Sequence, residues 1–208
     1  MYVPKSFEAP SQEAMHDIIR RYPLATVVTQ GEAGLTANHL PTTLEQSIGP
    51  LGSLRCHVAR SNSMWRECSA DTQALAIFQG PDCYVSPNWY PSKAETGEVV
   101  PTWNYIAVHA HGNIRIIDDR DWLLSQVDKL TQHHESAFPR PWSLSDAPAS
   151  YVEKMLKSIV GLEFKITRLE GKWKLSQNRS EPDRAGVVAG LRQQNANLMA
   201  DLVERPHG

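Results

Sequence analysis

Short segments with strand character recur through the first 117 residues, and they constrain the fold more than any other feature. Residues 51–59 place Leu54, Cys56 and Val58 at alternate positions, which is the period-2 pattern of a strand with one buried face. Many short strands of this kind, edged by helical segments, predict a β-barrel decorated with helices. The other strand-like segments are 24–30, 35–44, 74–79, 83–86 and 99–117.

Glycine-containing dipeptides and turns separate these segments. Residues 31–34 (Gly-Glu-Ala-Gly) predict the turn of a hairpin between the first two strands. Gly80-Pro81 predicts a turn between 74–79 and 83–86, and Glu170-Gly171 predicts a second hairpin between 162–168 and 172–177. Gly112 predicts a bulge or bend within the long segment 99–117.

Helical segments flank the strands. Residues 11–22 carry apolar side chains at helical spacing and end before Pro23, and residues 119–134 begin with acidic side chains. A short helix follows Pro148, and a last helix begins near Ser180. We therefore expect one domain, residues 1–208, mainly β with flanking helices and six or more antiparallel strands. It would carry a helical insertion at about 119–157 and a C-terminal helix at about 181–204.

Composition limits the class of protein. The net charge is −2 and the pI is about 6.4, so direct binding to DNA is not supported by charge, and no helix-turn-helix pattern supports it either. Three cysteines without a CxxC pair indicate reduced, buried thiols in a cytosolic protein. The N-terminus lacks the apolar core of a signal peptide, and no apolar stretch approaches the roughly 20 residues of a membrane helix. The sequence predicts a soluble, cytoplasmic protein with no membrane association.

A candidate anion site follows the strand at 51–59. Arg60, Ser61 and Asn62 come where the strand ends and a helix opens at residues 63–66. A helix N-terminus offers free N–H groups, and an arginine adds paired hydrogen bonds to an oxyanion. The same residues also suit ordinary helix capping with a solvent-facing arginine, and the pattern leaves both interpretations open.

Aromatic and amide side chains gather in two further segments, residues 84–90 and 100–105. Rings beside amides suit a planar, hydrogen-bonding ligand such as a flavin, a pterin or a base, and they equally suit a small hydrophobic core. The sequence offers no obvious catalytic acid or base beyond His39 and His57. Because no motif supports a catalytic role for either histidine, we assign no catalytic residue.

The sequence His109-Ala110-His111 invites a metal hypothesis, because alternate residues of a strand face the same side. The carboxylate that a cupin-like site would supply a few residues later is missing, since the next acidic residue is Asp118. We therefore interpret the pair as core or interface histidines and predict no metal. The motifs GxSxG, HExxH, GxGxxG and the P-loop are also missing.

Several motifs together resemble those of the PaiB-like family of FMN-binding negative transcriptional regulators, in the same order along nearly the whole chain. Ser63 departs from the proline that we expect in the family. The motifs are Met1-Tyr2-Val3-Pro4 with Phe7; Asn38-His39-Leu40-Pro41; His57-Val58-Ala59-Arg60 with Asn62 and Trp65; Phe78-Gln79-Gly80-Pro81 with Tyr84-Val85-Ser86-Pro87 and Trp89-Tyr90; Val100-Pro101-Thr102-Trp103-Asn104-Tyr105 with His109-Ala110-His111-Gly112; and Lys174-Leu175-Ser176-Gln177-Asn178-Arg179.

The resemblance implies an FMN-binding split β-barrel, related to pyridoxamine-phosphate-oxidase-like flavoproteins, in a bacterial protein. It implies a homodimer with FMN in the groove between subunits, the phosphate near Arg60, and part of the site contributed by the partner. The FMN-binding residues that it implies are Ala37, Asn38, His57, Arg60, Ser61, Asn62, Trp103, Asn104, Tyr105, Gln177, Asn178 and Arg179.

Two functions remain open from the sequence. One is a flavin-dependent sensor or a negative transcriptional regulator, as the family label implies. The other is an FMN-dependent oxidoreductase acting on a small molecule or on reduced nicotinamide, in which the flavin supplies the chemistry and the protein supplies position and electrostatics.

Overall fold

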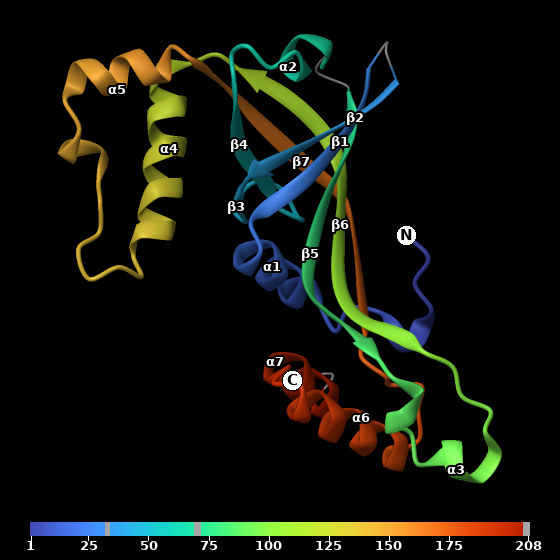
Figure 1. The fold of residues 1–208 in the computed structure, drawn as a ribbon. Helices are drawn as coiled ribbons and strands as arrows, with labels where there is room; N and C mark the ends of the chain where they lie inside the picture. The colour runs from blue at the N-terminus through green and yellow to red at the C-terminus, as the bar shows by residue number, and fades with distance from the viewer. Residues whose placement is uncertain (32–33, 69–71, 206–208) are drawn as a thin grey trace. The chain divides into compact units, whose positions relative to one another are not determined.

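The computed structural model describes residues 1–31, 34–68 and 72–205, and within them seven strands form one antiparallel sheet (Figure 1). The strand order is β2-β1-β5-β6-β7-β4-β3, so the sheet is not closed. This confirms the prediction of a mainly β fold with six or more antiparallel strands and flanking helices. The strands are β1 (Leu24–Gly31), β2 (Gly34–Pro41), β3 (Thr43–Glu45), β4 (Ser53–Ala59), β5 (Gln73–Val85), β6 (Thr102–Ile117) and β7 (Ile159–Lys174).

Seven α-helices accompany the sheet in the described ranges. None of them is long and apolar enough to cross a membrane. They are α1 (Gln12–Arg21), α2 (Met64–Glu67), α3 (Ser92–Thr96), α4 (Arg120–Glu135), α5 (Ala149–Leu156), α6 (Glu181–Gln193) and α7 (Asn197–Glu204), with single 3-10 turns at Lys5–Phe7, Pro87–Trp89 and Leu144–Asp146.

The chain divides into two compact units. Unit 1 comprises Met1–Ile18, Gln79–Val108 and Glu170–Gly208, and unit 2 comprises Ile19–Phe78 and His109–Leu169. Because β5, β6 and β7 are long, each of them contributes one end to each unit. The predicted organisation as a single domain stays a prediction.

Unit 2 is built on the β1–β2 hairpin and on the pairing of β4 with β7. The hairpin register runs from Leu24 opposite Pro41 to Gly31 opposite Gly34, which confirms the predicted pairing, although turn residues 32–33 lie outside the described residues. Leu54, Cys56 and Val58 are buried, as their alternation predicted. Buried apolar side chains at every second position therefore form the core of this unit.

The helical insertion of unit 2 contains α4 and α5 (Figure 1). Asp119 caps α4, because its Oδ1 accepts from the backbone N–H of Trp122 at 2.8 Å. Lys129 of α4 donates to Glu45 of β3 at 2.7 Å, which ties the helix to the sheet. The helices predicted after Asp118 and after Pro148 are both confirmed.

Unit 1 places α6 and α7 together (Figure 1), with Val187 and Leu191 of α6 and Val203 of α7 fully buried. Ser180 caps α6 as predicted, accepting from the N–H of Asp183. The Asp183 carboxylate in turn accepts from the N–H and hydroxyl of Ser92 at 3.1 and 2.9 Å.

Two predicted turns were wrong, because Gly80 and Gly171 lie inside the continuous strands β5 and β7. Neither glycine has a positive φ. A Cβ on Gly80 would lie 3.2 Å from the Cβ of Ile106, and a Cβ on Gly171 would lie 2.6 Å from that of Ala9. These glycines allow close approach of neighbouring residues rather than chain reversal.

Gly112 has the same role within β6. A Cβ there would lie only 2.1 Å from the carbonyl oxygen of Lys165 on β7. The glycine predicted to mark a bulge or bend is therefore required by the close approach of the neighbouring strand.

The predicted single C-terminal helix at 181–204 was also wrong, because the chain breaks between α6 and α7. Asn195 is left-handed, with a φ of 60°. Its N–H donates to the carbonyl of Arg192, and the N–H of Ala196 donates to that of Leu191. These two bonds form a Schellman motif, which ends α6.

Candidate functional site

Two asparagines bring distant strands of the unit 2 sheet together. Asn38 lies on the edge strand β2, and Asn62 follows β4, near the other end of the strand order. Asn62 donates from Nδ2 to the Oδ1 of Asn38 at 2.8 Å. The sheet of unit 2 therefore curls until β2 approaches β4, and we call the Asn38–Asn62 pair the β2–β4 seam.

Within the part of the chain that the structure describes, the seam holds one polar group that has no hydrogen-bond partner. The Oδ1 of Asn62 accepts from the backbone N–H of Met64 at 2.9 Å, which fixes the orientation of that amide. Asn38 must then present its oxygen to Asn62, and its Nδ2 is buried with no hydrogen-bond partner among the described residues. An unpaired buried donor costs roughly 1–3 kcal/mol, so an acceptor on a ligand would be stabilised there.

Arg60 is held mainly by other parts of the protein. It forms a paired salt bridge with Asp118 at 2.9 and 2.5 Å, and it donates to the carbonyls of Lys157 and Ile159. The Asp118 partner raises the pKa of Arg60, and the Arg60 hydrogen bond holds the pKa of Asp118 below its usual value. Four of the five guanidinium N–H groups are thus in use, and a bidentate contact to a phosphate requires release of Asp118.

The helix predicted after Arg60 is confirmed as α2, which spans four residues. Ser61 is exposed. The N-cap of α2 is Ser63, whose side chain makes no capping bond, and Asn62 instead accepts from the N–H of Met64. The capping interpretation of this segment therefore describes Asn62, while Ser61 is accessible to a ligand.

His57 lies elsewhere in unit 2, in contact with the helical insertion. Its Nδ1 is 2.8 Å from the Oε1 of Gln126 on α4. His57 also lines a cavity of about 260 Å³, and the residues lining it do not include Asn38, Arg60 or Asn62. His57 therefore lines a cavity that neither seam residue lines.

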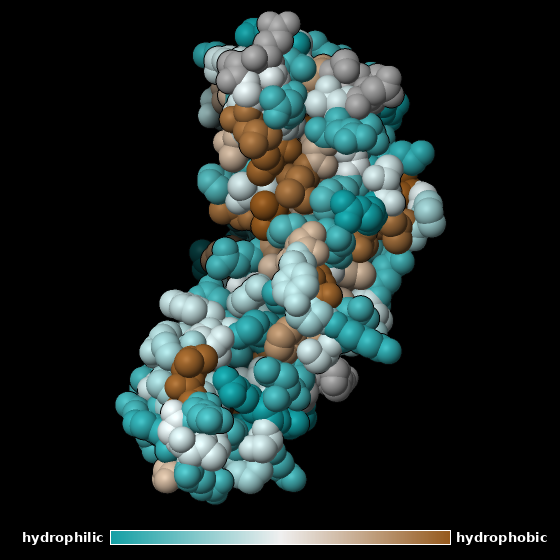
Figure 2. Space-filling view, turned by 90° about the vertical axis from the view of Figure 1, so that its right-hand side faces the viewer, coloured by the Kyte–Doolittle hydropathy of each residue, from teal (hydrophilic) through white to brown (hydrophobic). Residues whose placement is uncertain are grey.

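Ala37 faces away from its neighbour Asn38, since alternate residues of β2 point to opposite sides. It is exposed and lies opposite Val28 of β1. Val28, Leu35 and Leu75 line a larger cavity of about 580 Å³ on this face of the sheet. Figure 2 shows hydrophobic surface gathering in the upper part of the view, over the strands of unit 2.

In unit 1, the three consecutive residues predicted to flank the flavin take different environments. Trp103 is half-exposed and meets Tyr84 edge to face, with ring centroids 6.0 Å apart. Asn104 is fully buried and donates to the hydroxyl of Ser176 at 2.9 Å. The Tyr105 ring faces the ammonium of Lys172 at 5.4 Å. Asn104 therefore stabilises unit 1, and Trp103 is available for contact.

The predicted residues that follow β7 are mostly engaged within unit 1. Gln177 donates to the carbonyl of Trp173 at 2.5 Å and accepts from the N–H of Leu175 at 2.7 Å. The Arg179 guanidinium lies over the Tyr90 ring at 4.7 Å. Asn178 is exposed. Of these three residues, Asn178 is the most accessible.

The sequence reasoning did not single out three polar partners. Asp118 holds Arg60, Gln126 holds His57, and Lys174 donates to the Thr102 hydroxyl at 2.6 Å. Burial lowers the pKa of Lys174. In the sequence, Asp118 stands out only as the first acidic residue after His111 and Lys174 only as the first residue of the last family motif, and no local pattern marks Gln126.

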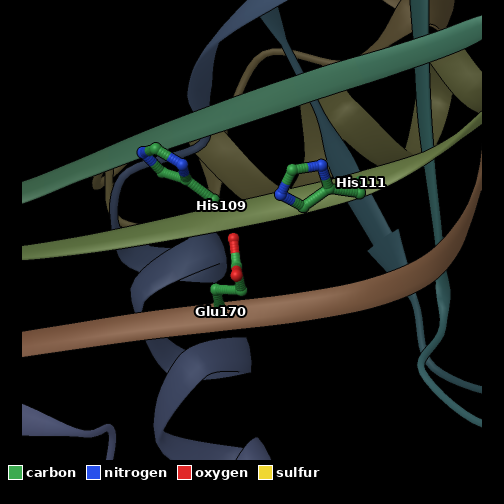
Figure 3. Close-up of side chains that lie close together, drawn as sticks. All are labelled: His109, His111 and Glu170. Carbon is green, nitrogen blue, oxygen red and sulfur yellow. The ribbon is translucent and has the colours of Figure 1, made fainter. Parts of the chain in front are cut away.

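The rings of His109 and His111 project from β6 with centroids 6.5 Å apart, and Figure 3 shows them together with Glu170 of β7. The Glu170 carboxylate accepts from the N-terminal ammonium of Met1 at 2.7 Å, so it already has a cationic partner within unit 1. We assign no metal to these residues.

The three cysteines are free thiols, as predicted, but the prediction that they are buried holds only for Cys56, since Cys68 and Cys83 are partly exposed. Burial raises the pKa of Cys56 to about 12 and that of Cys83 to about 11. Neither thiol is an activated nucleophile, because the reactive thiolate is disfavoured.

Comparisons with known proteins agree with this fold. A family model described as "Putative FMN-binding domain" matches residues 1–168. The "Protease synthase and sporulation protein PAI 2" of Bacillus subtilis is 32% identical over 207 residues, which cover 98% of this chain and 97% of that protein. An uncharacterized protein of the fungus Emericella nidulans is 36% identical over 212 residues, which cover 85% of this chain and 84% of that protein. Because relatives occur in bacteria and fungi, membership does not identify the kind of organism.

Solved structures show the same fold. The FAD and heme binding protein from Mycobacterium smegmatis superposes with a TM-score of 0.57 and 18% identity, over 88% of this chain and 80% of that one. At this identity the likeness shows the fold alone, a split barrel. Because the family model matches residues 1–168 and the Bacillus relative aligns along nearly the whole chain, this protein belongs to the PaiB-like family of FMN-binding domains, and its cofactor is FMN.

Proposed function

We propose that this protein is a homodimeric, flavin-dependent sensor or negative transcriptional regulator that holds FMN at the β2–β4 seam. The observation that carries the proposal is the end-to-end similarity to the Bacillus subtilis protein named for protease synthesis and sporulation, which covers 98% of this chain and 97% of the relative. A shared whole-chain architecture supports a shared role more strongly than a shared fold does.

The seam residues fit FMN. The buried Nδ2 of Asn38 lacks a partner among the described residues, and FMN carries many acceptors on its phosphate, ribityl chain and ring. Asn38 lies on an edge strand, so a ligand can lie along that edge and reach the amide of Asn38, whereas Ala37 points to the opposite face of β2. Ser61 adds an exposed hydroxyl beside Asn62.

When bound, FMN supplies electron transfer, while the protein supplies position and electrostatics. The Met64 N–H orients Asn62, and Asn62 orients Asn38, so the donor of Asn38 is held in place before the ligand arrives. Arg60 keeps a positive charge beside the seam, and Asp118 limits how many of its N–H groups can reach a phosphate. The unit 1 residues predicted for the flavin, and His57, remain predictions.

Two features support the proposed homodimer. Leu35 is 76% exposed, and it lies on the face of β2 that carries the large cavity with Val28 and Leu75. Contiguous exposed apolar surface marks interaction sites in soluble proteins. A second copy of this chain would cover that surface.

A second candidate is an FMN-dependent oxidoreductase. The Mycobacterium smegmatis neighbour is named as binding FAD and heme, which are redox cofactors. The net charge of −2 also disfavours a protein that neutralises DNA phosphates. In this role, reduced nicotinamide would donate a hydride to the flavin.

A titration of FMN into the full chain, followed by flavin fluorescence, tests the cofactor site. We expect Asn38→Ala to weaken binding by about three- to tenfold, as for a lost neutral hydrogen bond. Arg60→Ala should weaken it more, and Asp118→Asn should strengthen it by releasing the guanidinium. Arg120→Ala is the matched control, because Arg120 pairs with Glu153 on the insertion. Unchanged affinity in Asn38→Ala and Arg60→Ala would refute the seam as the FMN site.

The two functions separate with the FMN-loaded protein. A regulator should bind a promoter fragment, with an affinity that falls steeply as salt rises. An oxidoreductase should lose its flavin absorption on addition of reduced nicotinamide under anaerobic conditions. Loss of flavin absorption without binding to the promoter fragment would refute the regulatory role and support the oxidoreductase.

A further inference from the structure

We propose that the cavity under the helical insertion of unit 2 is a binding site for a small neutral aromatic alcohol or phenol. The cavity has a volume of about 260 Å³ and lies among β4, α4 and α5. Most of its lining is apolar, including Val127, Leu144, Val152 and Ile159. This inference does not depend on the proposed function.

The size of the cavity limits the ligand to about one ring. An apolar cavity of about 150 Å³ is known to bind benzene, whereas sites for drug-sized ligands begin at about 300 Å³. A cavity of about 260 Å³ therefore accommodates a substituted single ring and excludes FMN.

His57 of β4 lines the cavity, together with two residues that carry aliphatic hydroxyl groups, Thr131 and Ser158. Its Nδ1 is 2.8 Å from the Oε1 of Gln126. Gln126 is 1% exposed, and its Nε2 has no hydrogen-bond partner among the described residues. Gln126 therefore fixes the ring from behind and does not itself line the cavity, so the polar group that His57 offers to a ligand is its second ring nitrogen, Nε2.

The His57 ring favours a hydroxyl whichever way the Gln126 amide is oriented. If His57 Nδ1 donates to Gln126, the neutral ring offers Nε2 as an acceptor and Gln126 Nε2 remains a donor. If the amide is turned over, His57 Nε2 carries the proton and the Gln126 oxygen becomes the unpaired acceptor. In both arrangements the Nε2 of His57 is the ring nitrogen left for a ligand, as an acceptor in the first and a donor in the second, and a hydroxyl can pair with it in either case.

The lining also selects for a neutral ligand. Apart from His57, none of the described side chains that line this cavity is ionisable near neutral pH. A carboxylate would lose its hydration without a lysine or arginine to pair with, which is unfavourable. Trp142, Tyr151 and Met155 are 44%, 53% and 37% exposed, so the outer wall is open to solvent and offers rings for stacking.

Isothermal titration calorimetry of the full chain with phenol and with toluene tests the proposal. We expect phenol to bind about three- to tenfold more tightly than toluene, because only phenol pairs with the polar groups. His57→Phe keeps a ring in place but removes the nitrogens, and it should abolish this preference. Failure of phenol to bind, or a preference that survives in His57→Phe, would overturn the assignment.

A second pair of variants locates the ligand. Ala147 lines the cavity, whereas Ala137 is exposed in the same insertion and does not line it. Ala147→Phe should weaken phenol binding at least tenfold, and Ala137→Phe should leave it unchanged. If Ala147→Phe does not fold, Met155→Trp at the open wall takes its place. Binding that persists when the cavity is filled would place phenol elsewhere and refute the site.

Discussion

Arg60 shows how the partners of a single residue limit its chemistry. The sequence predicts an arginine at a helix start that either binds an oxyanion or faces solvent, whereas the structure gives its guanidinium a carboxylate and two carbonyls. Asn38 of the seam differs from Arg60, because its Nδ2 donor has no hydrogen-bond partner among the described residues. The availability of hydrogen-bonding groups, rather than residue type, therefore favours Asn38 as a ligand-binding residue.

The Arg60–Asp118 pair predicts a pH dependence of stability. The pKa of Asp118 is lower in the folded protein than its ordinary value of about 3.9. Its stabilising contribution is therefore full at neutral pH and is lost as the pH falls through the folded-state pKa. In urea unfolding, Asp118→Asn should be less stable than wild type at pH 7 and should approach wild type near pH 3. Asp128→Asn, whose carboxylate accepts from Gln132, is the control, and an equal deficit at both pH values would contradict this prediction.

At the scale of elements, glycines decide how closely strands approach one another. The contact of Gly112 with Lys165 leaves no room for a side chain, whereas the space at Gly80 beside Ile106 is tight and would open with a small shift of its neighbours. Both glycines lie in strands, and neither has a positive φ. Their effects therefore come from packing rather than from backbone conformation.

Gly112→Ala should destabilise the fold by at least about 2 kcal/mol, because the added methyl group must displace the backbone of β7. Gly80→Ala should lower the free energy of unfolding clearly less than Gly112→Ala does. The atoms nearest to the added methyl group are 3.2 Å or more away, so they need to move only slightly. The free energies of unfolding from urea titrations give the comparison. Equal losses in the two variants would contradict the packing explanation.

The break between α6 and α7 depends on one left-handed residue, Asn195. Asn195→Gly should be neutral or slightly stabilising, because glycine adopts this conformation without strain. Asn195→Val should destabilise by about 1–2 kcal/mol, the ordinary cost of a left-handed non-glycine residue. Thermal unfolding of both variants checks this, and a well-tolerated valine would show that the Schellman motif contributes little.

At the scale of the whole molecule, the proposed dimer can be tested through its exposed apolar face. The chain has a mass of 23.3 kDa, and light scattering should give twice that value. Leu35→Glu should shift the protein toward the monomer, since a charge would be buried against a second copy. Glu98→Gln, at another exposed position, should leave the mass unchanged. A monomeric wild type would refute the proposed homodimer.

Most secondary-structure elements could be predicted from the sequence. The buried alternation of Leu54, Cys56 and Val58, the capping of α6 by Ser180 and the helix start after Asn62 follow from local geometry. Such features depend on residues within a few positions of one another, so a short window of sequence contains their cause. The motifs also identified the family and therefore the cofactor.

The tertiary structure decided the features that join distant residues. Gly80 and Gly171 look like turns in sequence, and only Ile106 and Ala9 beside them show why each lies within a strand. Asn38 pairs with Asn62, Arg60 with Asp118, and His57 with Gln126, across separations that no local pattern encodes. The sequence by itself determined the elements, the family and the cofactor, because periodicity, capping and motif order are written along the chain. Which polar groups are paired or left for a ligand was decided by folding, because burial removes water and only neighbours in space can replace its hydrogen bonds.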